Sequence, residues 1–188
     1  MRCIVVVLLA GAAAGCVSQH ADHFYALGPV PNQPRESRSA FATQVRLTLT
    51  IPSLVDRNEL VVKSSAGVVV LEHERWASPL ADQMITVLGQ DIEQRRPDSL
   101  VVTRSLLRQN SPTVTVAVQV VSLNIDKNAH VAIETRWRVQ RDGADATQGR
   151  DSFEVPVAGN EYDAVSRALS GCLAGLADRL VREWPSSG

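Results

Sequence analysis

The chain has 188 residues with 19 basic and 20 acidic side chains, so its formal net charge is -1. This balance argues against bulk binding of nucleic acid or of an anionic membrane, and an aromatic content of 4% argues against a platform for stacked bases. A hydrophobic fraction of 45% and a charged fraction of 21% are typical of a folded domain, and the length suits one domain with flanking segments.

Residues 1–15 have the pattern of a secretory signal peptide, because Arg2 precedes an apolar run that gives way to small residues. This run is shorter than the ~20 residues of a spanning helix, so we expect no transmembrane helix in the mature chain. Residues 13–16 read AAGC and resemble a bacterial lipobox, in which Cys16 becomes the lipidated first residue. Cleavage without lipidation is the alternative, because Leu is the commonest residue where this chain has Ala13.

Lipidation of Cys16 would attach more than one acyl chain, and two or more chains anchor a protein stably to a membrane. Cys3 leaves with the signal peptide, so Cys172 would be the remaining free cysteine and could form no intramolecular disulfide. Cys172 lies in an apolar helical pattern, which favours a small buried hydrophobe over a reactive thiol.

Residues 16–43 are expected to form the lipidated cysteine and a flexible tether, because this stretch contains three prolines and several Ser, Gln and Asn residues. A short apolar patch at 23–27, HFYAL, interrupts the tether and could add an edge strand to the domain. His20 and His23 have no accompanying cluster of Cys or carboxylates, so we expect no metal site there. Residues 44–188 are expected to form a single domain.

Apolar and polar residues alternate over 45–51, which predicts a strand with one buried face. Residues 59–63 and 67–73 then predict a hairpin. Ser78 and Pro79 predict the start of a helix, with Ser78 as the N-cap and Pro79 at the first helical position. This helix is expected to end before Pro97.

The second half of the domain predicts more strands and one more helix. In the long strand at 113–125 the apolar alternation changes phase at Val121, which indicates a β-bulge. Short connections between the later strands favour an α+β fold with a mainly antiparallel or mixed sheet and two long helices packed on one face. The other predicted elements are strands at 100–103, 131–139 and 153–157 and an amphipathic helix at 162–184.

Known catalytic motifs are absent: the sequence has no GxxxxGK[ST], GxGxxG, GxSxG or HExxH. A Ser-His-Asp site built from dispersed residues stays open, but no spacing selects its members. We therefore predict no catalytic, cofactor-binding or metal-binding residues. Several polar residues at strand positions are interpreted as solvated or hydrogen-bonded structural groups: Glu72, Glu74, His73, His130, Arg136, Arg138 and Arg141.

The hexapeptide RWASPL at 75–80 is the most distinctive segment. We favour a hydrophobic staple, in which Trp76 or Ala77 rests on the first helical turn. Partner recognition is the alternative, because Arg and Trp are enriched at interface hot spots. The candidate structural or partner-docking residues are Arg75, Trp76, Pro79 and Leu80.

Taken in order, these segments resemble the ABC-type transport auxiliary lipoproteins, the PqiC-like family, over nearly all of the mature chain. That family has an F/Y-Y-x-L segment after the tether, then an L-P-x-x-L-D-R-x-x-x-V stretch, and an R-W-A-x-P-L box at the first helix. Ser78 stands where the family often has Glu. The matching residues are Phe24, Tyr25 and Leu27, then, more loosely, Leu54, Asp56, Arg57 and Val61, and finally Arg75, Trp76, Ala77, Pro79 and Leu80.

The resemblance implies an outer-membrane lipoprotein that faces the periplasm and assists an MCE-type ABC system, which moves lipids between the two membranes of a Gram-negative envelope. Val17 after Cys16 is compatible with outer-membrane sorting. The implied partners are an MCE-domain periplasmic protein, its ABC transporter and the membrane, with self-association left open. A membrane-tethered periplasmic hydrolase and a structural envelope adaptor are the competing classes.

Overall fold

The computed structural model describes residues 21–31, 43–103, 113–159 and 161–184, so the predicted signal peptide, Cys16 and His20 lie outside the described residues. A five-stranded sheet has the order β5-β2-β6-β7-β8, and a three-stranded sheet has the order β1-β4-β3. The elements are β1 (His23–Tyr25), β2 (Thr43–Thr50), β3 (Glu59–Ser64), β4 (Gly67–Trp76), α1 (Leu80–Arg95), β5 (Ser99–Val102), β6 (Thr113–Ile125), β7 (His130–Arg141), β8 (Thr147–Pro156) and α2 (Tyr162–Arg182).

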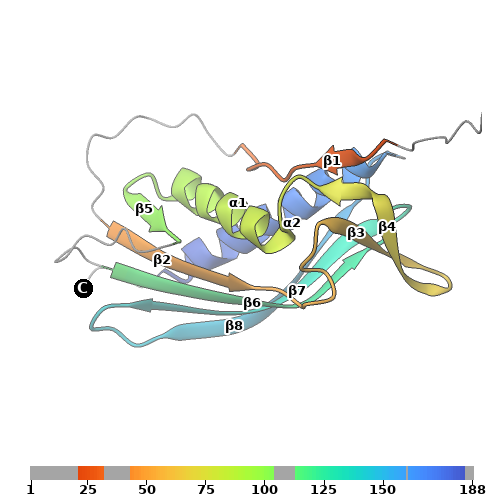
Figure 1. The fold of residues 1–188 in the computed structure, drawn as a ribbon. Helices are drawn as coiled ribbons and strands as arrows, with labels where there is room; N and C mark the ends of the chain where they lie inside the picture. Colours follow the sequence, from red (N-terminus) through yellow and green to blue (C-terminus); the bar gives the residue numbers. More distant parts are fainter. Residues whose placement is uncertain (1–20, 32–42, 104–112, 160, 185–188) are drawn as a thin grey trace, which may run out of the picture.

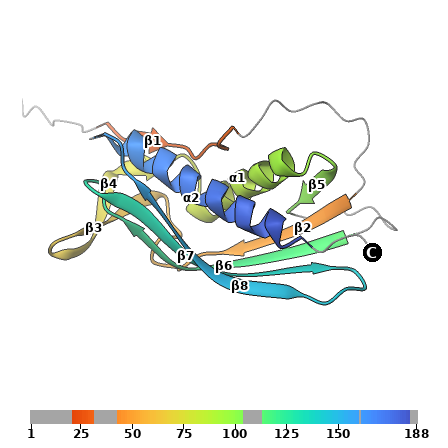
Figure 2. The same ribbon diagram turned by 180° about the vertical axis from the view of Figure 1, so that it is seen from behind.

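Both helices cover one face of the five-stranded sheet, and the three-stranded sheet lies at one end of it (Figure 1). The view from behind shows α2 crossing the sheet on the same side as α1 (Figure 2). β2 pairs in parallel with β5 and β6, whereas β6, β7 and β8 are antiparallel, so the sheet is mixed. The predicted α+β class with two helices on one face is confirmed, although the sequence did not predict a second sheet.

The bulge predicted in β6 is confirmed. Val120 lies opposite Thr135 and Ser122 lies opposite Glu134, which leaves Val121 as the extra residue. β2 pairs with β6 only as far as Gln119. Beyond that residue, β7 is the one described strand that pairs with β6.

Helix α1 begins one residue later than predicted. Pro79 has φ -47° and ψ 133°, so it is the N-cap residue and Leu80 is the first helical residue. The carbonyl oxygen of Pro79 accepts the N–H groups of Asp82 and Gln83, at 3.1 and 3.2 Å. The prediction of Ser78 as the N-cap was therefore wrong, because the extended ψ of Pro79 moves the helix start past it.

Strand β8 also begins earlier than predicted, at Thr147 instead of residue 153. The sequence did not predict its first half, because few residues there have apolar side chains that face the helices. Gly149 lies opposite Trp137, and a Cβ at Gly149 would come within 2.4 Å of the Trp137 ring. Trp137 is 3% exposed and donates its indole N–H to Asp151, at 2.6 Å.

Residues 26–31 follow β1 and lie against both helices. The N–H of Leu27 donates to Gln83 of α1, at 2.8 Å, and the N–H of Gly28 donates to Ser170 of α2, at 3.2 Å. Val30 N–H donates to the carboxylate of Asp91, at 3.1 Å. Asp91 is fully buried, and burial raises its pKa to about 6 although Arg95 opposes this shift.

β1 pairs in parallel with the end of β4, with His23 opposite Glu74 and Tyr25 opposite Trp76. The apolar patch at 23–27 therefore does supply an edge strand, as the sequence suggested. Neither helix in the described part of the chain is both long and apolar enough to cross a membrane.

Candidate functional site

An apolar groove lies between the β3–β4 hairpin and the bulged half of β6. Its volume is about 320 Å³. The loop after β2 closes one side of the groove, and β3 and β6 form its walls. The lining residues are Pro52, Leu54, Val55, Val61, Val62, Lys63, Gly67, Val68, Val121, Ser122, Leu123, Asn124 and Ile125.

Two strand edges that have no partner among the described strands face each other across this groove. β3 is the outer strand of the three-stranded sheet, so its far side is an edge. β6 loses its β2 partner after Gln119, so residues 121–125 also present an edge. Strand edges of this kind can pair with an added extended segment. The groove thus combines an apolar lining with backbone that is suited to binding another chain.

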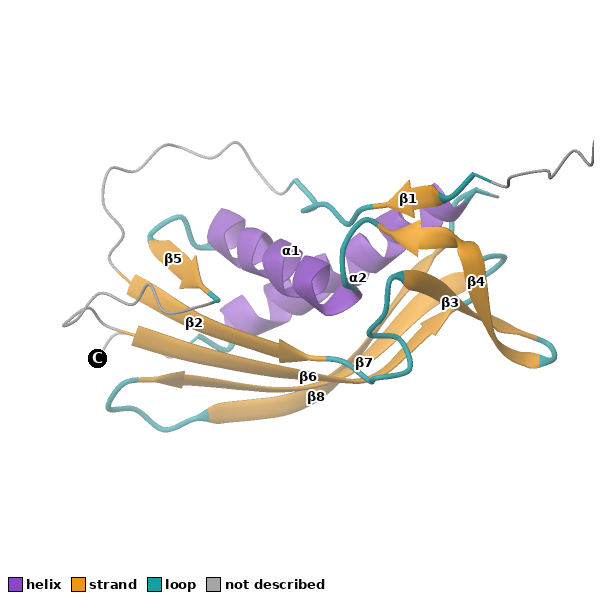
Figure 3. Cartoon of the chain, in the orientation of Figure 1, coloured by secondary structure: helices purple, strands orange, loops and turns teal. Residues whose placement is uncertain are grey.

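The hairpin beside the groove exposes apolar side chains. Figure 3 shows its tip projecting away from the rest of the molecule. Val68, Val69 and Val70 on β4 are 58%, 39% and 37% exposed, and Leu54 in the adjacent loop is 54% exposed. Exposed apolar side chains that cluster in this way are common at interaction sites.

The groove has the chemistry of a binding site. Among the described residues that line it, Lys63 is the one charged group, and Ser122 and Asn124 are the other polar side chains. Among these residues there is no His, Asp, Glu or Cys beside the Ser122 hydroxyl, so the groove lacks the residue types that most often activate a serine. This composition suits an apolar ligand or partner segment.

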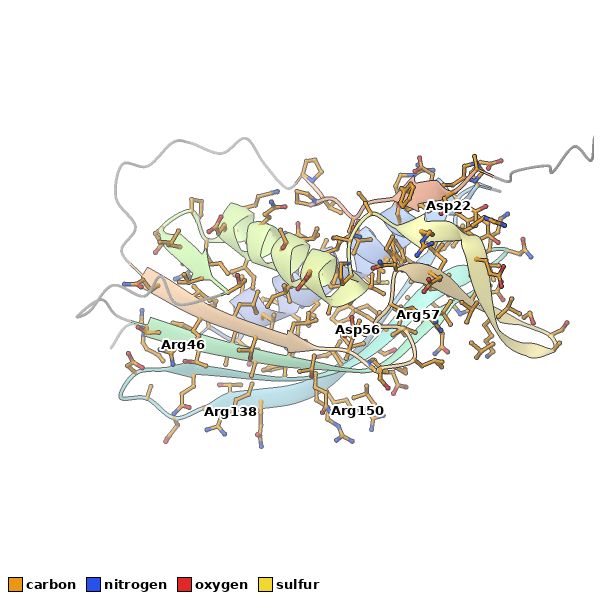
Figure 4. The ribbon with its side chains drawn as sticks, in the orientation of Figure 1. Asp22, Arg46, Asp56, Arg57, Arg138 and Arg150 are labelled. Atoms are coloured by element: carbon orange, nitrogen blue, oxygen red, sulfur yellow. The ribbon has the colours of Figure 1, made fainter. Side chains whose placement is uncertain are left out.

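The groove was not predicted from the sequence, although a signal for it was present. The run Val68-Val69-Val70-Leu71 has no polar residue between its apolar ones, unlike the half-buried strand β2. Two residues of the stretch that carries the family resemblance, Leu54 and Val61, line the groove. Figure 4 shows Asp56 and Arg57 of the same stretch beside the loop that leads into β3.

The RWASPL segment joins β4 to α1. Trp76 is 2% and Leu80 is 1% exposed, and both lie in one buried cluster with Met84. The Trp76 N–H donates to the carbonyl of Asn58, at 2.6 Å. These contacts support the structural interpretation of Trp76 and Leu80, while Pro79 supplies the helix N-cap.

Arg75 is the charged member of the segment and is half-buried. Its guanidinium donates to Glu59 of β3, at 3.2 Å, and to Asp22, at 3.5 Å. His73 lies 3.0 Å from the same Asp22 carboxylate, and these bonds lower the pKa of Asp22. Arg75 therefore links the segment before β1 to the three-stranded sheet.

The other polar residues singled out in the sequence form no catalytic group among the described residues. The Tyr25 hydroxyl donates to Glu74, at 2.6 Å, and His130 lies 3.7 Å from Glu154. Arg136 and Arg138 are exposed as expected, but Arg141 is half-buried opposite Val114, on the helix-facing side of the sheet. Its interpretation as part of the solvated face was wrong, because β7 continues to residue 141 and side-chain alternation turns it inward.

Cys172 is fully buried on α2, and its thiol lies 3.4 Å from the carbonyl oxygen of Val131. Burial raises the pKa of this thiol to about 12, so it stays protonated and unreactive at neutral pH. Within the described ranges, no group of three or more His, Cys, Asp or Glu side chains is placed to hold a metal ion.

Residues 25–181 match the family model of the ABC-type transport auxiliary lipoprotein component. An uncharacterized protein of known crystal structure is 19% identical, with a TM-score of 0.68 over 87% of this chain and 99% of that one. A protein from Xanthomonas campestris is 16% identical, with a TM-score of 0.58 over 86% of this chain and 91% of that one. These two structures share the fold of this chain. No curated protein matches the sequence.

Proposed function

Since the chain belongs to the family of ABC-type transport auxiliary lipoproteins, we propose that it serves an MCE-type ABC system that moves lipids between the inner and outer membranes of a Gram-negative envelope. In this proposal the protein is anchored in the outer membrane through lipidated Cys16 and faces the periplasm. It acts by binding, without catalysis, and its partner is the MCE-domain protein of the system.

The observation that carries the proposal is the apolar groove. Its exposed rim at Leu54 and Val68 and its two facing strand edges suit a protein partner that adds an extended segment. Its described lining contains no His, Asp or Glu of the kind found in a Ser-His-Asp site. The groove thus favours an auxiliary role over the competing hydrolase.

Binding of the mature chain to the MCE-domain protein encoded beside its gene tests the proposal. We expect Val68→Asp to weaken binding at least tenfold, because a charge at the groove rim opposes apolar contact. Ser65→Asp is the matched control, since it adds the same charge to the exposed hairpin turn outside the groove lining, and it should bind like the wild type. Absence of binding by the wild type, with hydrolysis of an ester substrate that one Ser or His substitution abolishes, would instead show an enzyme.

Anchoring is tested separately by Cys16→Ser. We expect this variant to remain unprocessed or to leave the outer-membrane fraction, because lipid is the one anchor in the proposal. Fractionation in cells that lack the transporter removes retention by partners. Outer-membrane retention of the Ser variant in those cells would contradict the lipid anchor.

A further inference from the structure

The face of the five-stranded sheet that points away from the helices carries a cluster of arginines. We define the basic face by Arg46 of β2, Arg136 and Arg138 of β7 and Arg150 of β8, all of which are exposed. Figure 4 shows Arg46, Arg138 and Arg150 projecting on the side of the sheet opposite the helices. The groove lies elsewhere, against the three-stranded sheet, so this is a second surface.

Strand register brings three of these guanidinium groups together. Arg136 lies directly opposite Arg150, and Arg138 is two residues along β7 on the same face. Like charges placed directly opposite each other destabilise a sheet. A structural role therefore does not account for Arg136 and Arg150 in this register.

Few acidic groups neutralise the cluster. Glu134 lies 3.0 Å from Arg150, and Glu154, farther along β8, pairs with His130. Arg138 donates to the amide oxygen of Gln140, at 3.2 Å. Because this partner is neutral, the hydrogen bond does not compensate the charge of Arg138. The guanidinium of Arg136 has no hydrogen bond or ion pair with any residue that the structure describes.

Neutral hydrogen-bonding side chains surround the arginines. A shallow depression of about 350 Å³ lies on this face and includes Ala117 in its lining. Guanidinium groups bind carboxylates through two parallel hydrogen bonds, and Arg is enriched at protein interfaces. The lining of the depression is Thr48, Thr50, Ala117, Val118, Gln119, Arg136, Trp137, Arg138 and Gln148.

We propose that the basic face is a docking surface for a carboxylate-rich surface of a partner protein. Charge complementarity selects an acidic occupant. A protein fits better than a bilayer, because the described residues of this face include no exposed large apolar or aromatic side chain to insert among lipids. The chain as a whole also has a net charge of -1. The acidic chemistry stands on the structure alone, whereas the partner's identity as the MCE-domain protein rests on the proposed function.

The test compares two double charge reversals of the mature chain. Arg136→Glu with Arg138→Glu changes the basic face, and Arg167→Glu with Arg182→Glu makes the same charge change at exposed positions of α2. The first probe is an octaglutamate peptide at low salt, which needs no knowledge of the partner. We expect the wild type and the α2 variant to bind it and the basic-face variant to lose binding at least tenfold.

The second probe is the MCE-domain protein, measured at 50 and 300 mM NaCl, concentrations chosen to bracket a Debye length of about 10 Å. We expect the basic-face variant to lose at least tenfold in affinity and most of the salt dependence. If the wild type binds this protein and the basic-face variant binds it equally well, the docking surface is wrong while the proposed function stands. If the wild type binds only the peptide, the proposed function fails and the acidic preference remains.

Two further outcomes would overturn the proposal. In the first, the basic-face variant loses binding to phosphatidylglycerol vesicles, and in the second it loses self-association of the protein. In each case the variant keeps the affinity of the wild type for both probes. Arg136→Thr with Arg138→Thr provides a folded control if the Glu variant does not fold. Its Tm should equal or exceed that of the wild type, because the substitution relieves repulsion with Arg150. A large fall in Tm would assign the arginines to the fold and overturn the proposal.

Discussion

Two valine-rich strands of this protein differ completely in their surroundings. In β6, Val114, Val116 and Val118 are at most 4% exposed, because they alternate with polar residues and face the helices. In β4, Val68, Val69 and Val70 are 37–58% exposed, because the hairpin projects beyond the helices. The same residue type therefore builds the core in one strand and an exposed apolar surface in the other, and the difference lies in whether the helices cover the strand.

The largest effect is expected at the far end of β4, where the strand enters the core. Trp76→Ala should lower the free energy of unfolding by roughly 3–5 kcal/mol, the usual cost of removing a buried aromatic side chain. Phe24→Ala, at a position that is 63% exposed, is the control and should cost less than about 0.5 kcal/mol. Urea unfolding measures both. Equal, small costs would show that the burial of Trp76 does not stabilise the fold.

The comparison extends to aspartates, because Asp22 is partly exposed with a lowered pKa whereas Asp91 is buried with a pKa raised to about 6. The folded state holds the Asp91 proton more tightly than the unfolded state, so this group's contribution to stability falls as pH rises from about 4 to 6. The free energy of unfolding of Asp91→Asn, measured relative to that of the wild type, should therefore rise by roughly 2–3 kcal/mol between pH 4 and pH 7.

Urea unfolding at several pH values checks this expectation, with Asp82→Asn at an exposed position of the same helix as the control. Asn at residue 91 can still accept the Val30 N–H through its amide oxygen. A constant difference between the wild type and Asp91→Asn over this pH range would contradict the raised pKa.

The two valine sets themselves give the most direct comparison. Val116→Ala should lower the free energy of unfolding by about 2 kcal/mol, because it removes buried apolar surface and leaves a cavity. Val69→Ala should cost less than about 1 kcal/mol, which is the span of β-propensity alone. The difference between the two midpoints of urea unfolding is the decisive quantity. Similar costs would mean that the hairpin is covered in the isolated protein, and the exposed apolar surface would need another explanation.

Local patterns predicted much of this fold. The phase change at Val121 was sufficient for the bulge, because side-chain alternation is a local property of a strand. No local pattern determined the exact start of α1. The start depends on the ψ angle of Pro79, and a proline can adopt both helical and extended values of ψ. The first half of β8 could not be predicted either. Gly149 has no side chain at an inward position of this strand, and the Trp137 ring of the neighbouring strand occupies that space.

The candidate surfaces depend on distant pairings that no local pattern contains. The groove exists because β2 stops pairing at Gln119 and because β3 ends a separate sheet. The basic face depends on the register of β7 and β8, which sets Arg136 against Arg150. The sequence showed the alternating arginines of β7, but it could not show that β8 adds a third from 14 residues away along the chain.

The pairing of β1 with β4 also sets how far the protein can stand from a bilayer. With Cys16 lipidated as proposed, seven residue steps separate the anchor from His23, the first residue of β1. A fully extended chain covers at most ~3.6 Å per residue, so the segment between Cys16 and His23 can span at most about 25 Å. A tether that ran free to Thr43 would reach roughly 100 Å by the same measure. A segment this short would keep a lipidated protein close to the membrane surface, so under this proposal a partner would have to approach that surface to bind it.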